Sequence, residues 1–273
     1  MLARLRSFLR QFLRLDPAVL VMLAILALTF ISLPIVRWTL GDGSLRTGIE
    51  IGVLVQAGTV TVLLGRAWSR RRLLATLAAV IILAWGAEFL GSRTGFPFGR
   101  YHYTDLLQPQ LGGVPLLIPF AWLMMLPPSW AIASIISPPP SGRKGEGTGL
   151  GVALLSSLAM TAWDLFLDPQ MVAWGFWAWE EPSGYFGIPW TNYLGWLLVT
   201  FVVTLVIRPR DLPVGPLVAV YALTWFLESF GQLFFWGLPG PAVCGFLGMG
   251  VILLWAALRN GRRSTIRGLQ ESQ

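Results

Sequence analysis

The chain has 273 residues, of which 55% are hydrophobic and only 12% are charged, and its formal net charge is +7. A soluble domain normally carries about a quarter charged residues, so this composition excludes water as the main solvent of the fold. The basic residues stand in short clusters between long apolar runs. This pattern excludes a continuous nucleic-acid-binding surface and indicates the anionic face of a membrane as their partner.

Eight apolar segments are long enough to cross the ~30 Å hydrocarbon core of a bilayer. Backbone amides in lipid must form hydrogen bonds within their own segment, so each segment is predicted to be a helix. The sequence therefore predicts an all-α integral membrane protein with about eight transmembrane helices and one transmembrane domain over residues 17–258. The predicted helices cover residues 17–36, 48–65, 73–90, 114–136, 150–168, 192–207, 214–236 and 240–258.

The positions of Lys and Arg predict the orientation of these helices. With both termini on one side of the membrane, all but four of the 20 basic residues fall on that side. Because positive residues concentrate in cytoplasmic loops, both termini are predicted to be cytoplasmic, in the cytoplasmic membrane of a prokaryote. The four exceptions are Arg37, Arg46, Arg93 and Arg100.

Two further parts of the chain are predicted outside the transmembrane domain. Residues 1–16 place leucines and a phenylalanine on one helical face and arginines elsewhere, which predicts an amphipathic helix on the inner membrane surface. Residues 259–273 are predicted to form a basic cytoplasmic tail. The loops on the outer side are predicted to be partly re-entrant.

Acidic residues follow the opposite pattern and gather on the side away from the termini. Ionisable groups within spans are costly and usually face a cavity, which makes four of these acids candidate functional residues. These acids are Glu88, Asp164, Asp168 and Glu228. The alternative for each one is a structural role, in which it pairs with Arg93 or Arg100 or caps loop amides.

Asp164 and Asp168 are four residues apart in the segment WDLFLDP, so their carboxyl groups share one face of a helix that is expected to end before Pro169. Two acids in a weakly solvated site do not both ionise readily, so one of them is expected to hold a proton at neutral pH. A protonated carboxyl group is the group needed to add a proton to an alkene.

Aromatic residues are dense in the outer loops and sparse in the cytoplasmic loops. Their rings can stabilise a cation by ~0.5 to 2 kcal/mol each in a desolvated site. A belt of aromatics at the membrane interface explains many of them, but it does not explain the difference between the two sides. Together with the acids, these rings indicate a cavity for an apolar substrate.

The single histidine and single cysteine limit the other chemistry that is open to the chain. Membrane oxygenases that hydroxylate lipids hold iron with many histidines, and His102 alone cannot build such a centre. A hydroxyl group that this protein installs is therefore expected to come from water, with no metal and no cofactor. Cys244 has no second cysteine with which to form an intrachain disulfide.

A weak internal repeat indicates that helical hairpins recur along the chain. Gly113-Val114-Pro115 is followed by Trp122, and Gly187-Ile188-Pro189 is followed by Trp196 at the same spacing. Gly237-Leu238-Pro239 resembles a degenerate third copy. Because proline is common at helix starts, this repeat supports repeated hairpins more than it supports a function.

Two segments carry a resemblance to a known family. In residues 88–122, Glu88 is followed by Gly95-Phe96-Pro97-Phe98-Gly99, Tyr101-x-Tyr103 and Trp122. In residues 164–196, the motifs are Asp164, Asp168-Pro169, Tyr185-Phe186-Gly187-Ile188-Pro189, Asn192-Tyr193 and Gly195-Trp196. In this order the motifs resemble the membrane carotenoid-biosynthesis family, which includes carotenoid 1,2-hydratases.

The resemblance implies a cofactor-independent hydro-lyase that adds water across the terminal C1=C2 bond of an acyclic carotenoid end group, by acid catalysis through a tertiary carbocation. In that reading Asp164 or Asp168 donates the proton and Glu88 positions the water. The implied substrate-binding residues are Tyr101, Tyr103, Trp122, Tyr185, Asn192 and Trp196. Accessory candidates are Glu228, His102 and Arg93.

Two other functions stay open at this point. A carotenoid end-group cyclase or isomerase would use the same protonated intermediate and end by losing a proton. A non-enzymatic lipid or proton-coupled carrier would use intramembrane acids to relay protons. The expected partners are a carotenoid in the bilayer, water, membrane lipids and other enzymes of the carotenoid pathway, and no nucleic acid.

Overall fold

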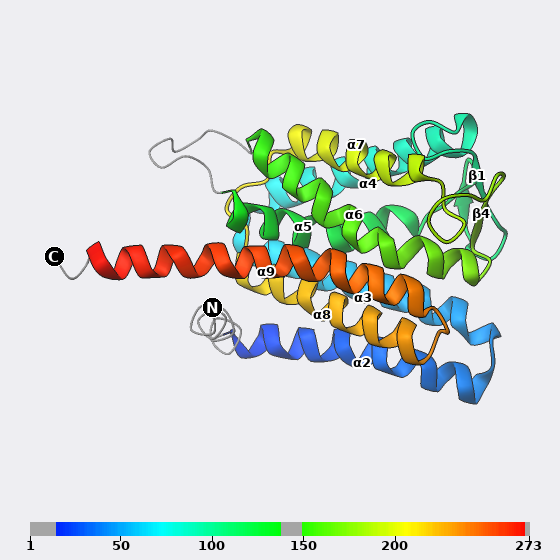
Figure 1. Ribbon diagram of the computed structural model, residues 1–273, viewed down its shortest axis with the longest axis horizontal. Helices are drawn as coiled ribbons and strands as arrows, with labels where there is room; N and C mark the ends of the chain where they lie inside the picture. The colour runs from blue at the N-terminus through cyan, green and yellow to red at the C-terminus, as the bar shows by residue number, and fades with distance from the viewer. Residues whose placement is uncertain (1–14, 138–148, 271–273) are drawn as a thin grey trace.

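The computed structural model describes residues 15–137 and 149–270, which form mainly helices packed side by side (Figure 1). Within these ranges, 8 helices are long and apolar enough to cross a membrane, which confirms the predicted span count. The helices are α2 (Pro17–Leu40), α3 (Gly43–Ala67), α4 (Arg70–Thr94), α5 (Ile118–Ile136), α6 (Leu150–Ala173), α7 (Trp190–Ile207), α8 (Val214–Phe234) and α9 (Pro239–Gln270). Short strands are β1 (Tyr101–Tyr103), β2 (Gln110–Leu111), β3 (Val114–Pro115) and β4 (Trp177–Trp179).

Successive helices run in opposite directions, so the bundle has two distinct ends (Figure 1). We call the end where α2 begins and α9 ends the terminal end, and the end that carries β1 and β4 the strand end. The four exceptional arginines belong to the strand end, because they lie at the ends of α2 and α4, at the start of α3 and just before β1. The cytoplasmic position of the terminal end and the re-entrant character of the loops stay predictions.

Local signals fix the ends of the helix that carries Glu88. Ser69 precedes α4, and its hydroxyl accepts a hydrogen bond from the backbone N–H of Arg72 at 3.4 Å. At the other end Gly95 adopts φ of 78°, a left-handed conformation that ends the helix and that glycine adopts without strain. The chain therefore leaves α4 one and a half to two turns after Glu88 and turns back toward the bundle.

Helix α5 is the central helix of the bundle, since every residue from 121 to 133 is buried. It contains Pro127 and Pro128, and proline at position 128 leaves the carbonyl of Met124 without its helical donor. The side chain of Gln56 on α3 supplies a donor instead, with its Nε2 3.4 Å from that carbonyl oxygen. A neighbouring helix thus satisfies the backbone group that the proline frees.

A similar hydrogen bond from another segment explains why the predicted end of α6 is wrong. The helix continues through Pro169 to Ala173 and does not stop before the proline. Proline at 169 frees the carbonyl of Leu165, and the Tyr185 hydroxyl donates to that oxygen at 3.1 Å. Because the partner comes from a loop about twenty residues away, local sequence rules could not show that α6 survives.

Other boundaries also differ from the prediction. Residues 114 and 115 form β3, which pairs with β2, and the helix predicted from 114 begins at Ile118. Helix α9 continues to Gln270, so the described part of the predicted tail 259–273 is helical. The predicted amphipathic helix 1–16 lies almost entirely outside the described residues.

The strand end is held together by a two-stranded ribbon that joins two loops. Strand β1 pairs with β4 in antiparallel register, so that Tyr101 lies opposite Trp179 and Tyr103 lies opposite Trp177. The pairing ties the connection between α4 and α5 to the connection between α6 and α7. It therefore places the two helices that carry Glu88 and the aspartates at a fixed distance from each other.

Phe98 anchors this ribbon between two glycines on different helices. A Cβ atom at Gly91 of α4 would lie 2.6 Å from the Phe98 ring, and a Cβ atom at Gly195 of α7 would lie equally close to its other edge. At Gly195 the added atom would also lie 2.8 Å from the Pro97 carbonyl oxygen. The two helices therefore approach the loop at distances that only glycine allows.

We expect Gly195→Ala to lower the free energy of unfolding by about 1 to 3 kcal/mol, because overpacking forces the Pro97–Phe98 backbone to move. Thermal unfolding in detergent, followed by tryptophan fluorescence, would measure the change. Gly58→Ala is the matched control, since nothing lies within 4 Å of a Cβ at this helical glycine on α3. Equal loss of stability in both variants would contradict the assigned role of Gly195.

Candidate active site

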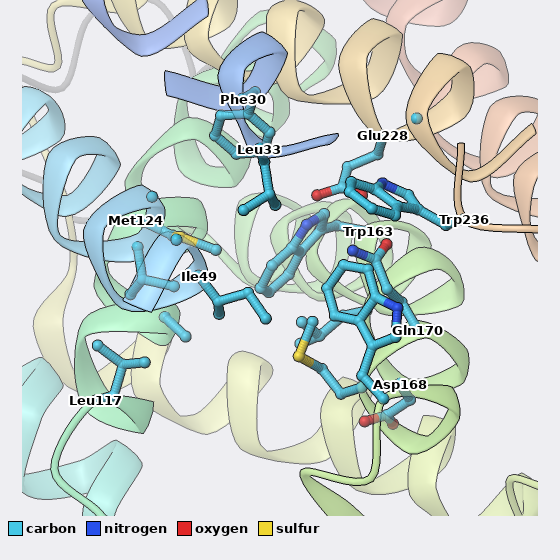
Figure 2. A pocket seen from close by; sticks show the side chains of 18 of the residues that line it. Phe30, Leu33, Ile49, Leu117, Met124, Trp163, Asp168, Gln170, Glu228 and Trp236 are labelled. Atoms are coloured by element: carbon cyan, nitrogen blue, oxygen red, sulfur yellow. The ribbon is translucent and has the colours of Figure 1, made fainter. Parts of the chain in front are cut away.

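A cavity of about 500 Å³ lies among the helices toward the strand end. Its walls come from α2, α3, α4, α5, α6, α7 and α8 and from the β1 and β4 loops. Most lining residues are apolar or aromatic, and the acids Glu88, Asp168 and Glu228 and the amide of Asn192 line it as well. Figure 2 shows Asp168 and Glu228 at different sides of the cavity, with Trp163 between them. The cavity thus combines an apolar interior with a few polar groups, as small-molecule sites commonly do.

Glu88 is held by three donors from two other segments. Its Oε2 accepts hydrogen bonds from the hydroxyls of Tyr101 at 2.5 Å and Tyr103 at 2.8 Å, and its Oε1 accepts from Nε1 of Trp122 at 2.9 Å. The side chain is only 5% exposed. No arginine contributes to this site, because the ion pairs of the described residues all involve other acids. The set of donors suits an anionic carboxylate.

The two tyrosines act as donors to Glu88 in their neutral form. Burial raises the pKa of the Tyr101 hydroxyl well above its usual range, and the nearby charge of Glu88 adds to the shift. The pKa of Tyr103 is raised well above its usual range for the same two reasons, again with burial as the larger cause. Both hydroxyls therefore keep their protons at any pH at which the protein is expected to work.

Asp164 and Asp168 form a buried pair around one amide. Nδ2 of Asn192 donates to Oδ2 of Asp164 at 3.1 Å and also to Oδ2 of Asp168. Both residues are buried, with 0% of Asp164 and 3% of Asp168 exposed. Asp168 lines the cavity, whereas Asp164 lies behind it. Asp164 therefore reaches the cavity only through Asp168 and Asn192.

A chain of contacts links this pair to Glu88. Nε1 of Trp177 donates to Oδ1 of Asp168 at 3.1 Å, and the Trp177 ring packs edge-on against Tyr103 with centroids 5.7 Å apart. Tyr103 in turn donates to Glu88. Because Tyr103 and Trp177 are opposite one another in the β1–β4 ribbon, the ribbon sets the separation of the two acidic groups.

Two tryptophans at equivalent positions of the sequence repeat stack at the centre of the site. The rings of Trp122 and Trp196 are nearly parallel, at 6°, with centroids 4.3 Å apart. Trp163 packs edge-on against Trp196 at 6.1 Å. All three line the cavity, so flat aromatic faces lie beside the carboxyl groups.

Several of the predicted site residues do not reach the cavity. Tyr185 binds the Leu165 carbonyl, and the lining does not include it. His102 is exposed between the two ribbon tyrosines, on the other face of β1. Arg93 is exposed, stacks on Phe89 and donates to the carbonyl of Gly112 at 3.4 Å. The other predicted residues line the cavity, apart from Asp164 as described.

Sequence reasoning missed some residues of the site. Trp177 was given no individual role, although the spacing of Trp177 and Trp179 around Ala178 is the period of a strand and could have indicated a ribbon. Gln170 lines the cavity two residues after Asp168. Phe30, Leu33 and other residues of α2 also line it, and a span without an acidic residue gave no signal for them.

Within residues 15–137 and 149–270, no group of three or more His, Cys, Asp or Glu side chains is placed to hold a metal ion.

Known proteins share these features of the sequence. A family described as "Carotenoid biosynthesis protein" matches residues 48–252. Over 130 residues the chain is 38% identical to bisanhydrobacterioruberin hydratase of Haloarcula japonica, and the alignment covers 47% of this chain and 42% of that protein. The matched region therefore spans less than half the length of that relative. No solved structure matches the chain. Because the family match covers most of the chain, including Glu88, Asp164 and Asp168, the chain belongs to this carotenoid biosynthesis protein family.

Proposed function

We propose that this protein adds water across the terminal C1=C2 double bond of an acyclic carotenoid, which gives a tertiary 1-hydroxy end group. The observation that carries the proposal is the buried aspartate pair, of which Asp168 lines an aromatic cavity that a separately held carboxylate, Glu88, also lines. The name of the relative from Haloarcula japonica supports the same reaction class. The proposed chemistry needs no cofactor, because proton transfer and water addition use only side chains and solvent.

Asp168 is the proposed proton donor, because it is the member of the pair that lines the cavity. Two carboxyl groups that face one amide in a site closed to bulk water favour a shared proton over two negative charges. The C1=C2 electron pair takes this proton at C2, and the positive charge appears at C1. Asp164 then acts as a positioning residue, because its carboxyl group favours the state in which the pair holds one proton.

The tryptophan cluster is the proposed stabiliser of the cation. The ring faces of Trp122 and Trp196 and the edge-packed Trp163 lie in the cavity wall. Each aromatic face contributes ~0.5 to 2 kcal/mol to a desolvated cation. These rings are fixed by packing against one another, so they do not need to reorganise as the charge develops.

Glu88 is the proposed base for the second half of the reaction. A water molecule next to its carboxylate forms the C–O bond at C1 and gives its proton to Glu88. The proton then returns to the aspartate pair, so one turnover consumes one water and no net proton. The three donors on Glu88 fix the carboxylate in position for this step.

The membrane setting of this reaction is part of the proposal. On the positive-inside pattern of the sequence, the terminal end would lie in the cytoplasm of a prokaryote, and the strand end with its acids would lie on the outer side. The carotenoid would reach the site from the bilayer, and other enzymes of the carotenoid pathway would supply it. Residues 17–258 would then act as one transmembrane domain.

We expect a host that makes acyclic carotenoids to accumulate a product heavier by one water when it expresses this chain. Reaction in D₂O should place deuterium at C2, and reaction in H₂¹⁸O should place the heavy oxygen on C1. Mass spectrometry of extracted pigments would measure both labels. An isomerised or cyclised product of unchanged mass would instead support the cyclase reading, and no chemical change together with proton-coupled transport would support a carrier.

We expect Asp168→Asn and Glu88→Gln each to lower turnover by about 10² to 10⁴, the usual contribution of a general acid or base. Asp164→Asn should also lower turnover, since it removes the second carboxyl group of the pair. Turnover is measured as hydroxylated carotenoid formed per protein in detergent or vesicles. The variants should keep the elution volume and thermal transition of the parent protein, which separates lost chemistry from lost folding.

Glu180→Gln serves as the matched control, because Glu180 is an exposed acid directly after β4 and does not line the cavity. It should retain the turnover of the parent protein. Full activity in folded Asp168→Asn would rule out Asp168 as the proton donor.

A further inference from the structure

The cavity that contains Glu88 and Asp168 opens sideways between α2 and α8. The lining side chains that are exposed on the outside of the protein come from these two helices, whereas Phe98 and Trp122 near Glu88 are 2% and 1% exposed. We call this gap the lateral opening. It is formed by Ile31 (50% exposed), Ile35 (51%), Trp38 (68%), Phe226 (56%) and Phe230 (44%).

The lateral opening is apolar and lies in the span region of both helices. The five residues that form it are aliphatic or aromatic, and α2 has no charged residue between its first residue and Arg37. The opening therefore suits hydrocarbon and not water. Glu228 and Trp236 line the cavity close to each other (Figure 2).

Contacts close the lateral opening on the side of the strand end. The Trp38 ring meets the Phe235 ring edge-on at 5.4 Å, and the guanidinium of Arg37 lies over the Trp236 ring at 5.7 Å. These two contacts join the end of α2 to the residues that follow α8. Phe30, Trp163 and Asp168 line the cavity, with Phe30 and Asp168 on opposite sides of it (Figure 2).

The size of the cavity agrees with partial enclosure of a long ligand. A volume of about 500 Å³ is typical of sites for drug-sized molecules. It holds the end of a long polyene and leaves the remaining chain to pass out through the opening. Flat rings of Trp38, Phe226 and Phe230 offer stacking faces to a planar conjugated chain, which a flexible saturated acyl chain cannot use in the same way.

We infer that a linear polyene enters laterally from the bilayer between α2 and α8, so that its end reaches Asp168 while its chain lies against Ile31, Ile35, Trp38, Phe226 and Phe230. This inference rests on the proposed function for the identity of the ligand. It adds the path of access and the residues that hold the chain.

Single cysteines test the path, because Cys244 is the only cysteine and Cys244→Ala gives a cysteine-free background. Ile31→Cys and Phe226→Cys are each modified with a bulky maleimide or with a small methylthio group. Leu198→Cys on α7 is the matched control, since Leu198 is 44% exposed and does not line the cavity. Binding of an acyclic carotenoid is followed by quenching of tryptophan fluorescence, and hydration by mass spectrometry.

We expect the bulky label at Ile31→Cys or Phe226→Cys to weaken carotenoid binding by about tenfold or more, ~1.4 kcal/mol, relative to the small label. The two labels at Leu198→Cys should give equal binding. Carotenoid binding that the bulky label blocks, without any hydration, would sustain the lateral path and overturn the proposed reaction. Hydration and binding that proceed equally with both labels would overturn the lateral path and leave the reaction intact.

Competition with a saturated lipid tests whether the ligand of the opening is a polyene. A saturated long-chain lipid that displaces the carotenoid as effectively as a second carotenoid does would overturn the assignment of the opening to a polyene. Absence of both binding and hydration in the unmodified protein would overturn the reaction and the path together.

Discussion

The arrangement of the strand end depends on the hydrogen bonds that Glu88 accepts. A carboxylate inside a helical bundle is costly unless protein groups replace its water. Here Tyr101 and Tyr103 from β1 and Trp122 from α5 provide those groups. Tyr101 and Tyr103 are two residues apart in β1, so both side chains point to the same side of the strand. Strand β1 must therefore lie over Glu88, and the pairing with β1 fixes the position of β4. Satisfying one acid therefore fixes the ribbon that brings Trp177 to Asp168.

The sequence was sufficient for the number of helices and for most of the acids and rings in the site. Hydropathy identifies spans well because lipid leaves the backbone no other structure. It could not give the end of α6 or the start of α5. In α6, the Leu165 carbonyl freed by Pro169 finds the Tyr185 hydroxyl, a contact between segments that no local rule contains. The motif residue Tyr185 was therefore read as a substrate contact although its hydroxyl completes a helix.

The same limit explains the division between Asp164 and Asp168. Their spacing correctly placed both on one helix face, but helix periodicity does not say which of two residues one turn apart meets a cavity. In the structure Asp168 lines the cavity and Asp164 does not, while Asn192 on α7 binds both carboxyl groups. The apolar residues of α2 were out of reach for a different reason. A stretch of apolar residues looks the same in sequence whether it faces lipid or lines a cavity.

The hairpins of the weak sequence repeat place their acids in one cavity. Three hairpins, α4–α5, α6–α7 and α8–α9, each carry an acid toward the strand end of their first helix, and Glu88, Asp168 and Glu228 from these hairpins line one cavity. In the first two hairpins the loops pair as β1 and β4, and the equivalent tryptophans stack, so this part of the site is rigid. The third hairpin has no strand in this ribbon, and α2 beside it is among the least buried spans. The rigid pair of hairpins therefore suits chemistry that needs fixed groups, and the less constrained side next to α8 is where a bilayer ligand can pass between helices.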